Sequence, residues 1–436
     1  MKVFYSIDTL PPAEIEDIQG AFLAEAVQYA YYRSPYYRKR FDALRLVPPV
    51  IKKLVRIEDL PLTDRLDFQG NNWAFLATPQ RDIVEIVSTT GTTGDPAFVA
   101  LTKGDLDRLA LNEERSFGYA GVEHGDVFHL AVTCDNLFIA GIAYYLGIMR
   151  RGASVVRVGP QHTIRHLDLM RRLKPTGIVA VPSFMVQMYR RMDENGVSPR
   201  DLGLKKIVLI GDSIRNADFT TNALGRLIER AYYGSMIYST YGITEAQTSF
   251  CECDKYHGLH SHPDFVVVEI VDDTGAPLPD GEEGELVLTP LQIEGMPLLR
   301  YRTGDITFKV SEPCPCGRNS VRIGPILGRK YHRLKVKGVT LYPKAIENAV
   351  LGIDEVVNYQ IEVATGDDET DILTLRVGSY RDDQGFAAAL CNTIRAKTRV
   401  TPNVEIERPE EIEKRLFEGG CRKPITLKDM RLIQHG

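Results

Sequence analysis

Between residues 83 and 231 the chain alternates short apolar runs with longer amphipathic segments, and this alternation leaves few folds open. The apolar runs are 83–87, 127–132, 153–158, 177–181 and 206–210, and the amphipathic segments are 103–117, 162–173, 183–195 and 215–231. Runs of strand length separated by segments of helix length are typical of βαβ units. The pattern therefore predicts an α/β protein with a parallel sheet covered by helices on both faces.

The rest of the chain follows other patterns. Residues 13–45 favour helix with a break at Pro35. After about residue 264 the helical segments stop, and strands are expected at 265–271 and 284–289 with a turn starting at Asp272. We place a domain boundary after Gly328-Arg329. The expected domains are residues 1–329, with a β-rich subdomain over about 264–329, and a small mobile α+β domain over 330–436.

Within the small domain the pattern predicts strand, helix, two strands, helix and a final irregular segment. The boundary contains no low-complexity linker. A short connection of this kind favours a hinge between two domains that act on one cleft.

Charge and hydropathy exclude several classes of protein. The 53 Lys and Arg against 58 Asp and Glu give a net charge of −5, so no strong positive field is available to bind nucleic acid or an anionic membrane. The most apolar stretch, 139–149, is shorter than the roughly 20 residues that span a bilayer. The first residues lack the apolar core of a secretory signal. We therefore expect a cytoplasmic protein.

A loop rich in Thr and Gly directly follows the first apolar run. Small residues allow close approach, and backbone N–H and hydroxyl groups can surround a triphosphate. No Lys-Ser or Lys-Thr pair follows the second Gly, which disfavours a Walker A loop. The loop predicts phosphate contacts from Ser88, Thr89, Thr90, Gly91, Thr92, Thr93 and Gly94.

Two later motifs extend this interpretation. They are Tyr238-Ser239-Thr240-Tyr241-Gly242-Ile243-Thr244-Glu245 and Tyr301-Arg302-Thr303-Gly304-Asp305. An aromatic ring beside Gly can stack on adenine, a hydroxyl and a carboxylate can meet the α-phosphate and its Mg²⁺, and a later Asp can accept the ribose hydroxyls. Each motif alone is more often a surface turn or a helix cap, but together, in this order and at these separations, the motifs are specific. A hydrolase is disfavoured because no Gly-x-Ser-x-Gly elbow is found.

The cysteines point to a metal. Seven is an odd number and argues against a disulfide framework. Cys253 and His260 in one segment and Cys314-Pro315-Cys316 in another offer the ligands of a closed tetrahedral zinc site, which would be structural. Cys251 and His257 are substitute ligands, and a reduced thiol cluster without metal is the alternative.

These motifs together resemble the adenylate-forming superfamily (acyl-CoA synthetases, luciferase and peptide-synthetase adenylation domains), and within it the phenylacetate-CoA ligase family. The resemblance also includes Gly211-Asp212-Ser213 and the segments 284–289, 296–305, 313–318, 328–329 and 338–343. It implies a two-step reaction. A carboxylate attacks the α-phosphate of ATP to give acyl-adenylate and pyrophosphate, and the thiol of CoA then displaces AMP.

The resemblance also implies roles for individual residues. The catalytic residues would be Lys423, with Lys428 as the weaker candidate, together with Thr244 and Glu245, and Glu245 would bind Mg²⁺. Besides the Thr/Gly loop, the ATP-binding residues would be Gly211, Asp212, Ser213, Ser239, Tyr241, Gly242, Thr244, Asp305 and Arg329. The basic strip Arg333, Lys335, Lys337 and Gly338 would meet CoA, although an exposed strand with alternating Lys explains it equally well.

Substrate and acceptor are less constrained. Asn136, Phe138 and Ala140 would line the acyl pocket, and an aryl or arylalkyl carboxylate, with phenylacetate first, is the expected substrate. Tyr331 and His332 stand where the family often has acidic hinge residues, which leaves the pivot open. The alternatives are an adenylating enzyme with another acceptor or a stable adenylyl product, as with deazaflavin cofactors, and a nucleotide-binding module without catalysis. The family suggests a homodimer.

Overall fold

The computed structural model describes residues 7–46, 56–89, 96–159, 161–336, 339–353, 355–366, 371–381, 384–418 and 424–431. The chain divides into two compact units. The larger contains Met1–Thr220, Leu227–Thr303 and Thr307–Ile326, and the smaller contains Thr221–Arg226, Gly304–Ile306 and Leu327–Gly436. No helix among the described residues is both long enough and apolar enough to cross a bilayer.

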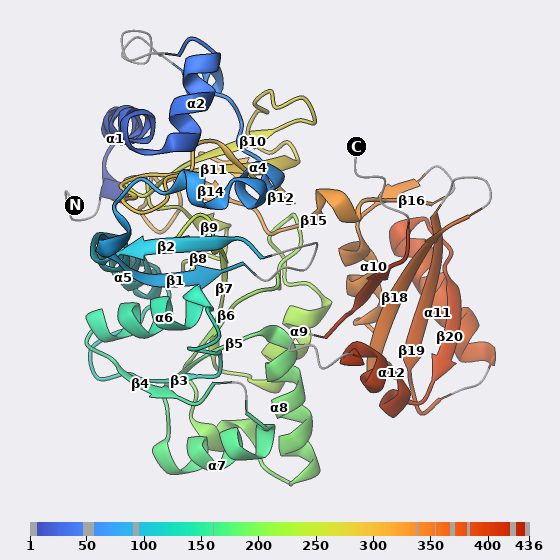
Figure 1. Cartoon of the computed structure of the whole chain (residues 1–436). Coiled ribbons are helices and arrows are strands. Elements are labelled where there is room, and N and C mark those ends of the chain that lie inside the picture. Colours follow the sequence, from blue (N-terminus) through green and yellow to red (C-terminus); the bar gives the residue numbers. More distant parts are fainter. Residues whose placement is uncertain are drawn as a thin grey trace. The chain divides into compact units, whose positions relative to one another are not determined.

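A mixed sheet forms the centre of the larger unit (Figure 1). Within the described residues its strand order is β13-β14-β9-β8-β7-β6-β5-β3-β4. The bounds are β3 Val127–Leu130, β4 Ser154–Arg157, β5 Gly177–Ala180, β6 Lys206–Leu209, β7 Met236–Ile243, β8 Thr248–Glu252, β9 Leu259–His260, β13 Lys309–Val310 and β14 Arg322–Ile323. The half from β4 to β7 is parallel, as the alternating pattern predicted, and the other half is antiparallel.

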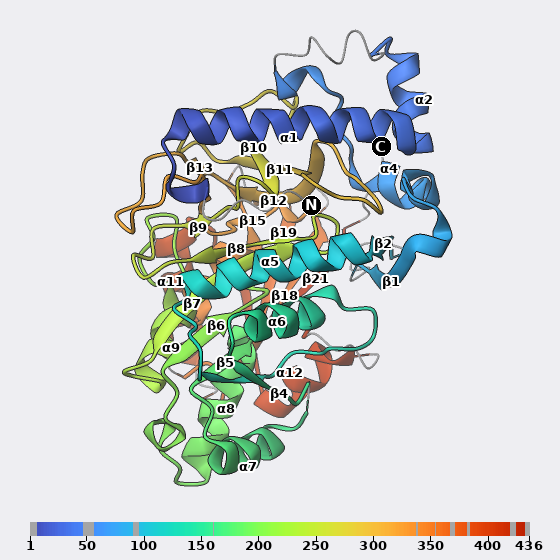
Figure 2. The same cartoon turned by 90° about the vertical axis from the view of Figure 1, so that its left-hand side faces the viewer.

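Helices cover this sheet and the N-terminal part of the unit. They are α1 Pro12–Arg33, α2 Pro35–Ala43, α4 Arg65–Gly70, α5 Lys103–Tyr119, α6 Ile139–Arg150, α7 Thr163–Leu173 and α8 Pro182–Glu194. Helix α9, Ala223–Ala231, is divided between the two units after Arg226. Short 3-10 turns lie at Ile7–Thr9, Ile57–Asp59, Asn72–Phe75, Gln80–Asp82 and Pro199–Leu202. Figure 2 shows α1 and α5 running across one side of the unit. The predicted break at Pro35 separates α1 from α2 and is confirmed.

Local hydrogen bonding sets two helix starts. Thr102 and Asp105 form a capping box at the start of α5, because the Thr102 hydroxyl accepts from the Asp105 N–H and the Asp105 side chain accepts from the Thr102 N–H. Helix α9 begins later than the predicted residue 215. Asp218 and Thr220 hold the preceding segment in a turn, in which the Asp218 carboxylate accepts from the Thr220 N–H over 3.0 Å.

The first predicted strand does not join the parallel sheet. β1 (Ile83–Ser88) pairs antiparallel with β2 (Phe98–Thr102), from Ile83 opposite Thr102 to Ser88 opposite Phe98. The prediction that residues 83–87 belong to a βαβ unit was therefore wrong. A parallel crossover needs a dozen or more residues, and the connection between β1 and β2 is too short for one.

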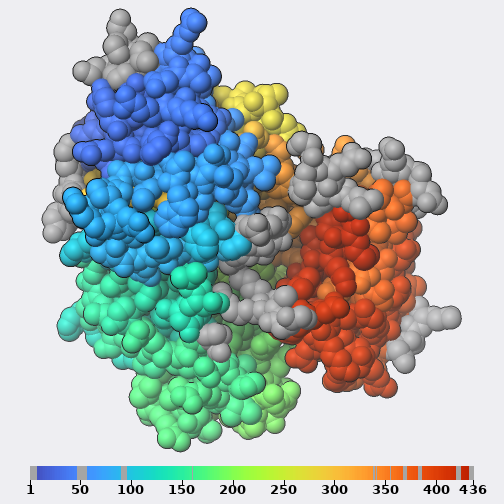
Figure 3. All heavy atoms as spheres, in the orientation of Figure 1, coloured from blue at the N-terminus to red at the C-terminus, as the bar shows by residue number. Residues whose placement is uncertain are grey.

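A second sheet follows the strand order β10-β11-β12-β15 among the described residues. Its strands are β10 Val266–Val271, β11 Gly284–Pro290, β12 Tyr301–Thr307 and β15 Gly328–Arg329. The predicted turn at Asp272 is present, since the Asp272 carboxylate accepts from Thr274 N–H over 2.8 Å. In Figure 3 the N-terminal residues cover one end of the larger unit and the green segment around α7 covers the other.

The smaller unit is an α+β structure with its own apolar core. Its elements are a 3-10 turn Lys330–His332, β16 Leu334–Val336, β17 Val339–Leu341, α10 Pro343–Val350, β18 Asn358–Thr365, β19 Asp371–Gly378, α11 Gln384–Thr398, β20 Asn403–Glu407, α12 Pro409–Leu416 and β21 Leu427–Asp429. The main sheet has the order β20-β19-β18-β21. The predicted irregular ending was wrong, because β20 and β21 pair with strands earlier in the chain rather than with a sequence neighbour.

Candidate active site and metal centre

The parallel half of the central sheet brings the predicted site segments to one edge. Leu130 of β3 pairs with Val179 of β5, and Leu209 of β6 pairs with Ser239 of β7. The segments 133–140 and 211–213 follow the carboxyl ends of β3 and β6, and the carboxyl end of β7 leads into the turn that contains Thr244 and Glu245. In open α/β sheets this edge is where ligands bind.

The segment after β6 is a tight turn. Gly211 has a φ of 78°, a left-handed conformation that favours glycine, and it lets the chain leave the strand at once. The Asp212 side chain accepts a hydrogen bond from Ser213 N–H over 2.8 Å, and the Ser213 hydroxyl donates to the Arg215 carbonyl over 3.2 Å. Gly211 and Asp212 are exposed. The turn therefore presents backbone and carboxylate groups at the sheet edge.

Ser239 and Tyr241 lie on β7 beside this turn. Ser239 is buried, and its N–H donates to Glu252 over 2.7 Å. Glu252 is also paired with Arg215 at 3.0 Å. Tyr241 is half-buried, and its ring packs at 5.9 Å from that of Phe250. Contacts from β8 thus fix the position of β7, and Tyr241 and Gly242 remain partly accessible to solvent.

Glu245 lies in the hairpin turn between β7 and β8. The turn ends at Gln247, whose φ is 47° and whose N–H donates to the Thr244 carbonyl over 3.3 Å. The Tyr301 hydroxyl donates to Oε1 of Glu245 over 3.0 Å. From the other side, Nη1 of the buried Arg108 donates to the Gln247 carbonyl over 2.7 Å. A half-buried carboxylate in a fixed turn is a suitable oxygen ligand for Mg²⁺.

The Thr/Gly loop begins next to the predicted acyl-pocket segment. Ser88 N–H donates to the Leu137 carbonyl over 2.9 Å, and Thr89 N–H donates to the Ala97 carbonyl over 2.9 Å. Asn136 and Leu137 have φ values of 56° and 58°, which non-glycine residues rarely adopt. Phe138 is the N-cap of α6 and Ala140 lies in its first turn. The predicted phosphate contacts Thr90, Gly91, Thr92, Thr93 and Gly94 lie outside the described residues.

The remaining predicted residues lie in the smaller unit. Asp305 pairs with Arg329 across β12 and β15, with 3.0 Å between Oδ1 and Nε. Lys335 is exposed on β16, and its N–H donates to Asp371. The Arg333 carbonyl accepts from Arg431 over 2.9 Å. Lys337, Gly338 and Lys423 lie outside the described residues. Lys428 lies on β21, and its Nζ is 3.2 Å from a carboxylate oxygen of Glu418.

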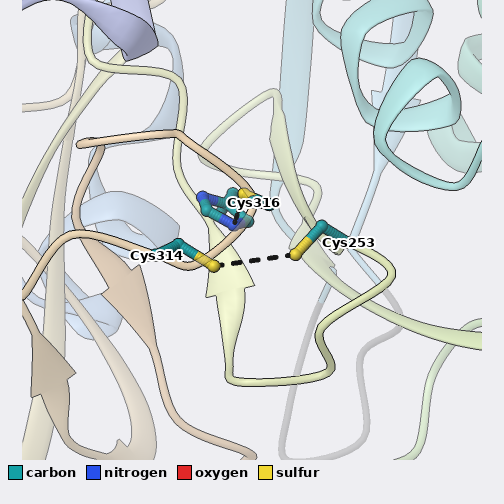
Figure 4. A group of neighbouring side chains, drawn as sticks. Cys253, Cys314 and Cys316 are labelled. Carbon is teal, nitrogen blue, oxygen red and sulfur yellow. Dashed lines mark hydrogen bonds between the residues drawn. The ribbon is translucent and has the colours of Figure 1, made fainter.

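The structure brings together the four predicted metal ligands. Ligand atoms of Cys253, His260, Cys314 and Cys316 all lie within 4.8 Å of one another. The Sγ atoms of Cys253 and Cys314 are 3.8 Å apart, and Sγ of Cys316 is 3.5 Å from Nε2 of His260 (Figure 4). Zinc bonds of roughly 2.3 Å to sulfur and 2.0 Å to nitrogen, arranged tetrahedrally, give separations of about 3.8 and 3.5 Å. These two separations therefore match those of a tetrahedral zinc site.

Neighbouring groups support this assignment. Nδ1 of His260 lies 3.1 Å from the Ser320 hydroxyl, an outer contact that fixes the ring with Nε2 toward the sulfurs. Burial raises the pKa of Cys316, but hydrogen bonds from His260 and Arg318 outweigh it and lower that pKa to about 5. Cys251 is buried on β8, and His257 stacks on Phe219 at 5.9 Å. Neither of these substitute ligands belongs to the group found among the described residues.

Sequence reasoning missed the residues that hold the Glu245 turn. Tyr301 was noted only as part of a motif, although its hydroxyl contacts Glu245 directly. Arg108 has no sequence signal beyond its place in an amphipathic segment, yet it is fully buried.

Two family models match the chain. The model described as AMP-binding enzyme matches residues 9–293. The model described as AMP-binding enzyme C-terminal domain matches residues 338–422.

Two of the similar proteins carry the same name. A phenylacetate-coenzyme A ligase of Thermus thermophilus is 35% identical over 363 residues, which cover 82% of this chain and 80% of that protein. A phenylacetate-coenzyme A ligase of Aromatoleum evansii is 30% identical over 415 residues and 92% of each chain.

Among solved structures, a 2-hydroxyisobutyryl-CoA ligase in the postadenylation state, in complex with 2-HIB-AMP, has a TM-score of 0.84. The match covers 98% of this chain and 94% of that one at 20% identity. At this identity the likeness shows the fold alone. The α/β fold with a small C-terminal domain, as predicted, is confirmed.

Proposed function

The chain belongs to the AMP-binding enzyme family, and we propose that it is an AMP-forming ligase that joins an aryl or arylalkyl carboxylate to CoA. The identity to phenylacetate-coenzyme A ligases extends over most of the chain and of those relatives. The observation that carries the proposal is the sheet edge where β6 ends opposite Ser239 of β7, with the turn Gly211–Ser213 after β6 and the Glu245 turn after β7. Phenylacetate is the first substrate to test.

In the first step the carboxylate attacks the α-phosphate of ATP, the bond to pyrophosphate breaks, and acyl-adenylate forms. Negative charge must approach negative charge, so oriented cations and donors are required. The proposal assigns Mg²⁺, which offsets phosphate charge, to Glu245. Thr244 offers a hydroxyl to the α-phosphate, and Lys423 is the mobile cation that meets the charge developing during transfer.

The other contacts follow from the same proposal. Tyr241 and the turn Gly211–Ser213 border the adenine, and Asp305 with Arg329 holds the ribose. Asn136, Phe138 and Ala140 line the acyl pocket. In the second step the CoA thiol attacks the acyl carbon, its proton is lost and AMP leaves. The basic strip that contains Arg333 and Lys335 attracts the phosphates of CoA by charge.

We also propose that Cys253, His260, Cys314 and Cys316 hold one structural Zn²⁺. The separations between the donor atoms support the proposal, and a divalent cation offsets the cost of ionising thiols in a buried group. The ligands join the β8–β9 region to the loop before β14, which are distant in sequence. Such closed sites stabilise loops rather than catalyse.

Release of AMP from ATP with a panel of aromatic acids, with and without CoA, tests the function. We expect rapid AMP release with an arylalkyl acid that depends on CoA, with acyl-CoA as the product. AMP formation that never depends on CoA would reject the CoA assignment in favour of another acceptor. Absence of acid-dependent pyrophosphate exchange would reject adenylation itself.

Two expectations from the sequence remain predictions. They are a cytoplasmic location and a homodimer. Sedimentation equilibrium of the full chain checks the second, and a single species of about 49 kDa would contradict it.

A further inference from the structure

We infer that Tyr301 is a positioning residue for Glu245, and that its hydroxyl orients the carboxylate that binds Mg²⁺. The inference rests on the proposed function, which makes Glu245 the magnesium ligand. It adds a residue to which that proposal assigned no role. The contact is direct, with 3.0 Å between the Tyr301 hydroxyl and Oε1 of Glu245.

The position of the Tyr301 hydroxyl is itself fixed by packing. The side chain is 2% exposed, and its ring meets that of Phe68 edge-on at 6.2 Å. On either side of Tyr301 the backbone is paired with Thr63, whose N–H donates to the Arg300 carbonyl over 3.0 Å and whose carbonyl accepts from Arg302 N–H over 2.9 Å. A donor held in this way selects one orientation of its acceptor.

The backbone of the Glu245 turn is held independently. Arg108 donates to the Gln247 carbonyl over 2.7 Å and to the Thr248 hydroxyl over 2.9 Å. Its other hydrogen bonds go to the carbonyls of Leu291 and Phe265. Arg108 therefore sets where the turn lies, and Tyr301 sets which way the Glu245 side chain faces.

This division has a consequence for metal binding. A carboxylate that rotates freely must lose that freedom when it binds a metal, whereas one oriented by an outer hydrogen bond has lost it already. Loss of such an outer partner costs about 10- to 100-fold in metal affinity in other proteins. Tyr301→Phe keeps the ring and removes only the hydroxyl. We expect it to raise the Mg²⁺ concentration for half-maximal adenylation about 10-fold, with the KM for the carboxylate unchanged.

Tyr37→Phe is the matched control. Tyr37 is buried in the same aromatic cluster as Tyr301, and its hydroxyl lies 3.0 Å from that of Thr63 and accepts from Leu299 N–H over 2.7 Å. The Tyr37 hydroxyl is therefore engaged by Thr63 and Leu299 rather than by the Glu245 turn. Both variants lose a buried hydroxyl, so both should lower the melting temperature. Only Tyr301→Phe should change the Mg²⁺ dependence of pyrophosphate exchange.

Equal Mg²⁺ dependence in Tyr301→Phe and wild type, or an equal shift in both variants, would overturn the inference. A double-mutant cycle with Glu245→Asp adds a second measurement, because the shorter side chain withdraws the carboxylate from the hydroxyl. Tyr301→Phe should then have little further effect on Mg²⁺ dependence in the Glu245→Asp background. A full additional 10-fold shift there would contradict direct orientation.

Direct binding separates failure of the inference from failure of the proposed function. Mn²⁺ binding to the full chain, measured by electron paramagnetic resonance with a non-hydrolysable ATP analogue, needs no turnover. Weaker Mn²⁺ binding by Tyr301→Phe than by Tyr37→Phe supports the inference even if wild type adenylates no acid. Identical Mn²⁺ binding by the three proteins overturns it even if wild type is an active ligase.

Discussion

At the scale of single residues, Glu113 shows how packing alters chemistry. It lies on α5 with 3% of its surface exposed, against Gly147 of α6. A Cβ at Gly147 would come within 2.3 Å of the Glu113 Cβ, so the two helices can approach this closely only at a glycine. Burial raises the pKa of Glu113 to about 7, and a hydrogen bond with Ser249 opposes part of the shift. The group is therefore protonated in the native protein at mildly acidic pH.

Glu113→Gln tests this pKa. The pKa of Glu113 is higher in the folded than in the unfolded chain. The stability that the raised pKa contributes is therefore complete below pH 4.5 and is lost as the pH rises to about 7. The glutamine does not titrate. The unfolding free energy of Glu113→Gln relative to wild type should rise by up to about 1.4 kcal/mol per pH unit over this range. Urea denaturation of both proteins at pH 5 and pH 8 measures it, and an equal difference at both values would contradict the assignment.

The metal ligands give a second prediction at this scale. Purified protein should contain about one equivalent of Zn²⁺, and Cys314→Ser should lower both the metal content and the melting temperature, because binding free energy of the metal contributes to folding. Cys391→Ser is the control, since Cys391 is a half-buried free cysteine outside the cluster. Elemental analysis and thermal unfolding check both variants. Wild-type protein that is purified without metal and is nevertheless fully stable would instead support a reduced thiol cluster.

At the scale of elements, the β7–β8 hairpin connects the proposed active site to the core. Gly242 of β7 pairs with Ser249 of β8, so the Glu245 turn extends directly from the central sheet. The backbone and hydroxyl of Ser249 both donate to Asn112 of α5, over 2.9 and 3.0 Å. Helix α5 thus holds the hairpin by Asn112 and by Arg108. A local pattern of strand and helix does not reveal this dependence.

Arg108→Met tests the anchoring of the hairpin. The substitution keeps an unbranched apolar side chain but leaves several buried carbonyls without a donor, each at a cost of about 1–3 kcal/mol. We expect a loss of several kcal/mol in the free energy of unfolding and reduced adenylation at temperatures where the variant is folded. Lys103→Met on the same helix is the control, because its ion pair with Asp107 is exposed and screened by solvent. Equal effects of the two substitutions on chemical denaturation would refute the anchoring role.

At the scale of the whole molecule, the proposed reaction draws on residues of both units. The turns that contain Gly211 and Glu245 belong to the larger unit, and Asp305, Arg329 and Lys423 belong to the smaller. The smaller unit has its own sheet and its own apolar core. The proposal therefore assigns roles in the reaction to residues of each unit.

Lys423→Ala tests this division of the reaction. Loss of the cation should abolish ATP–pyrophosphate exchange, because charge then develops at the α-phosphate without compensation. Thioester formation from preformed acyl-adenylate should be spared. Lys428→Ala is the control, because that side chain is paired with Glu418. Exchange at the wild-type rate in Lys423→Ala would remove Lys423 from the mechanism. Loss of exchange in Lys428→Ala alone would assign the role of the catalytic cation to Lys428 instead.

The sequence by itself determined the α/β class, the order of the motifs and a ligand set that meets in space. These features are encoded locally, by hydrophobic period and by residues such as Cys314 and Cys316 that share one short loop. Tertiary structure decided the antiparallel partner of β1, the pairing of β21 with β18 and the contact of Tyr301 with Glu245. That contact joins residues 56 positions apart, and its length depends on how two sheets pack. Periodicity records which residues are buried, but only the packed chain specifies which buried groups meet.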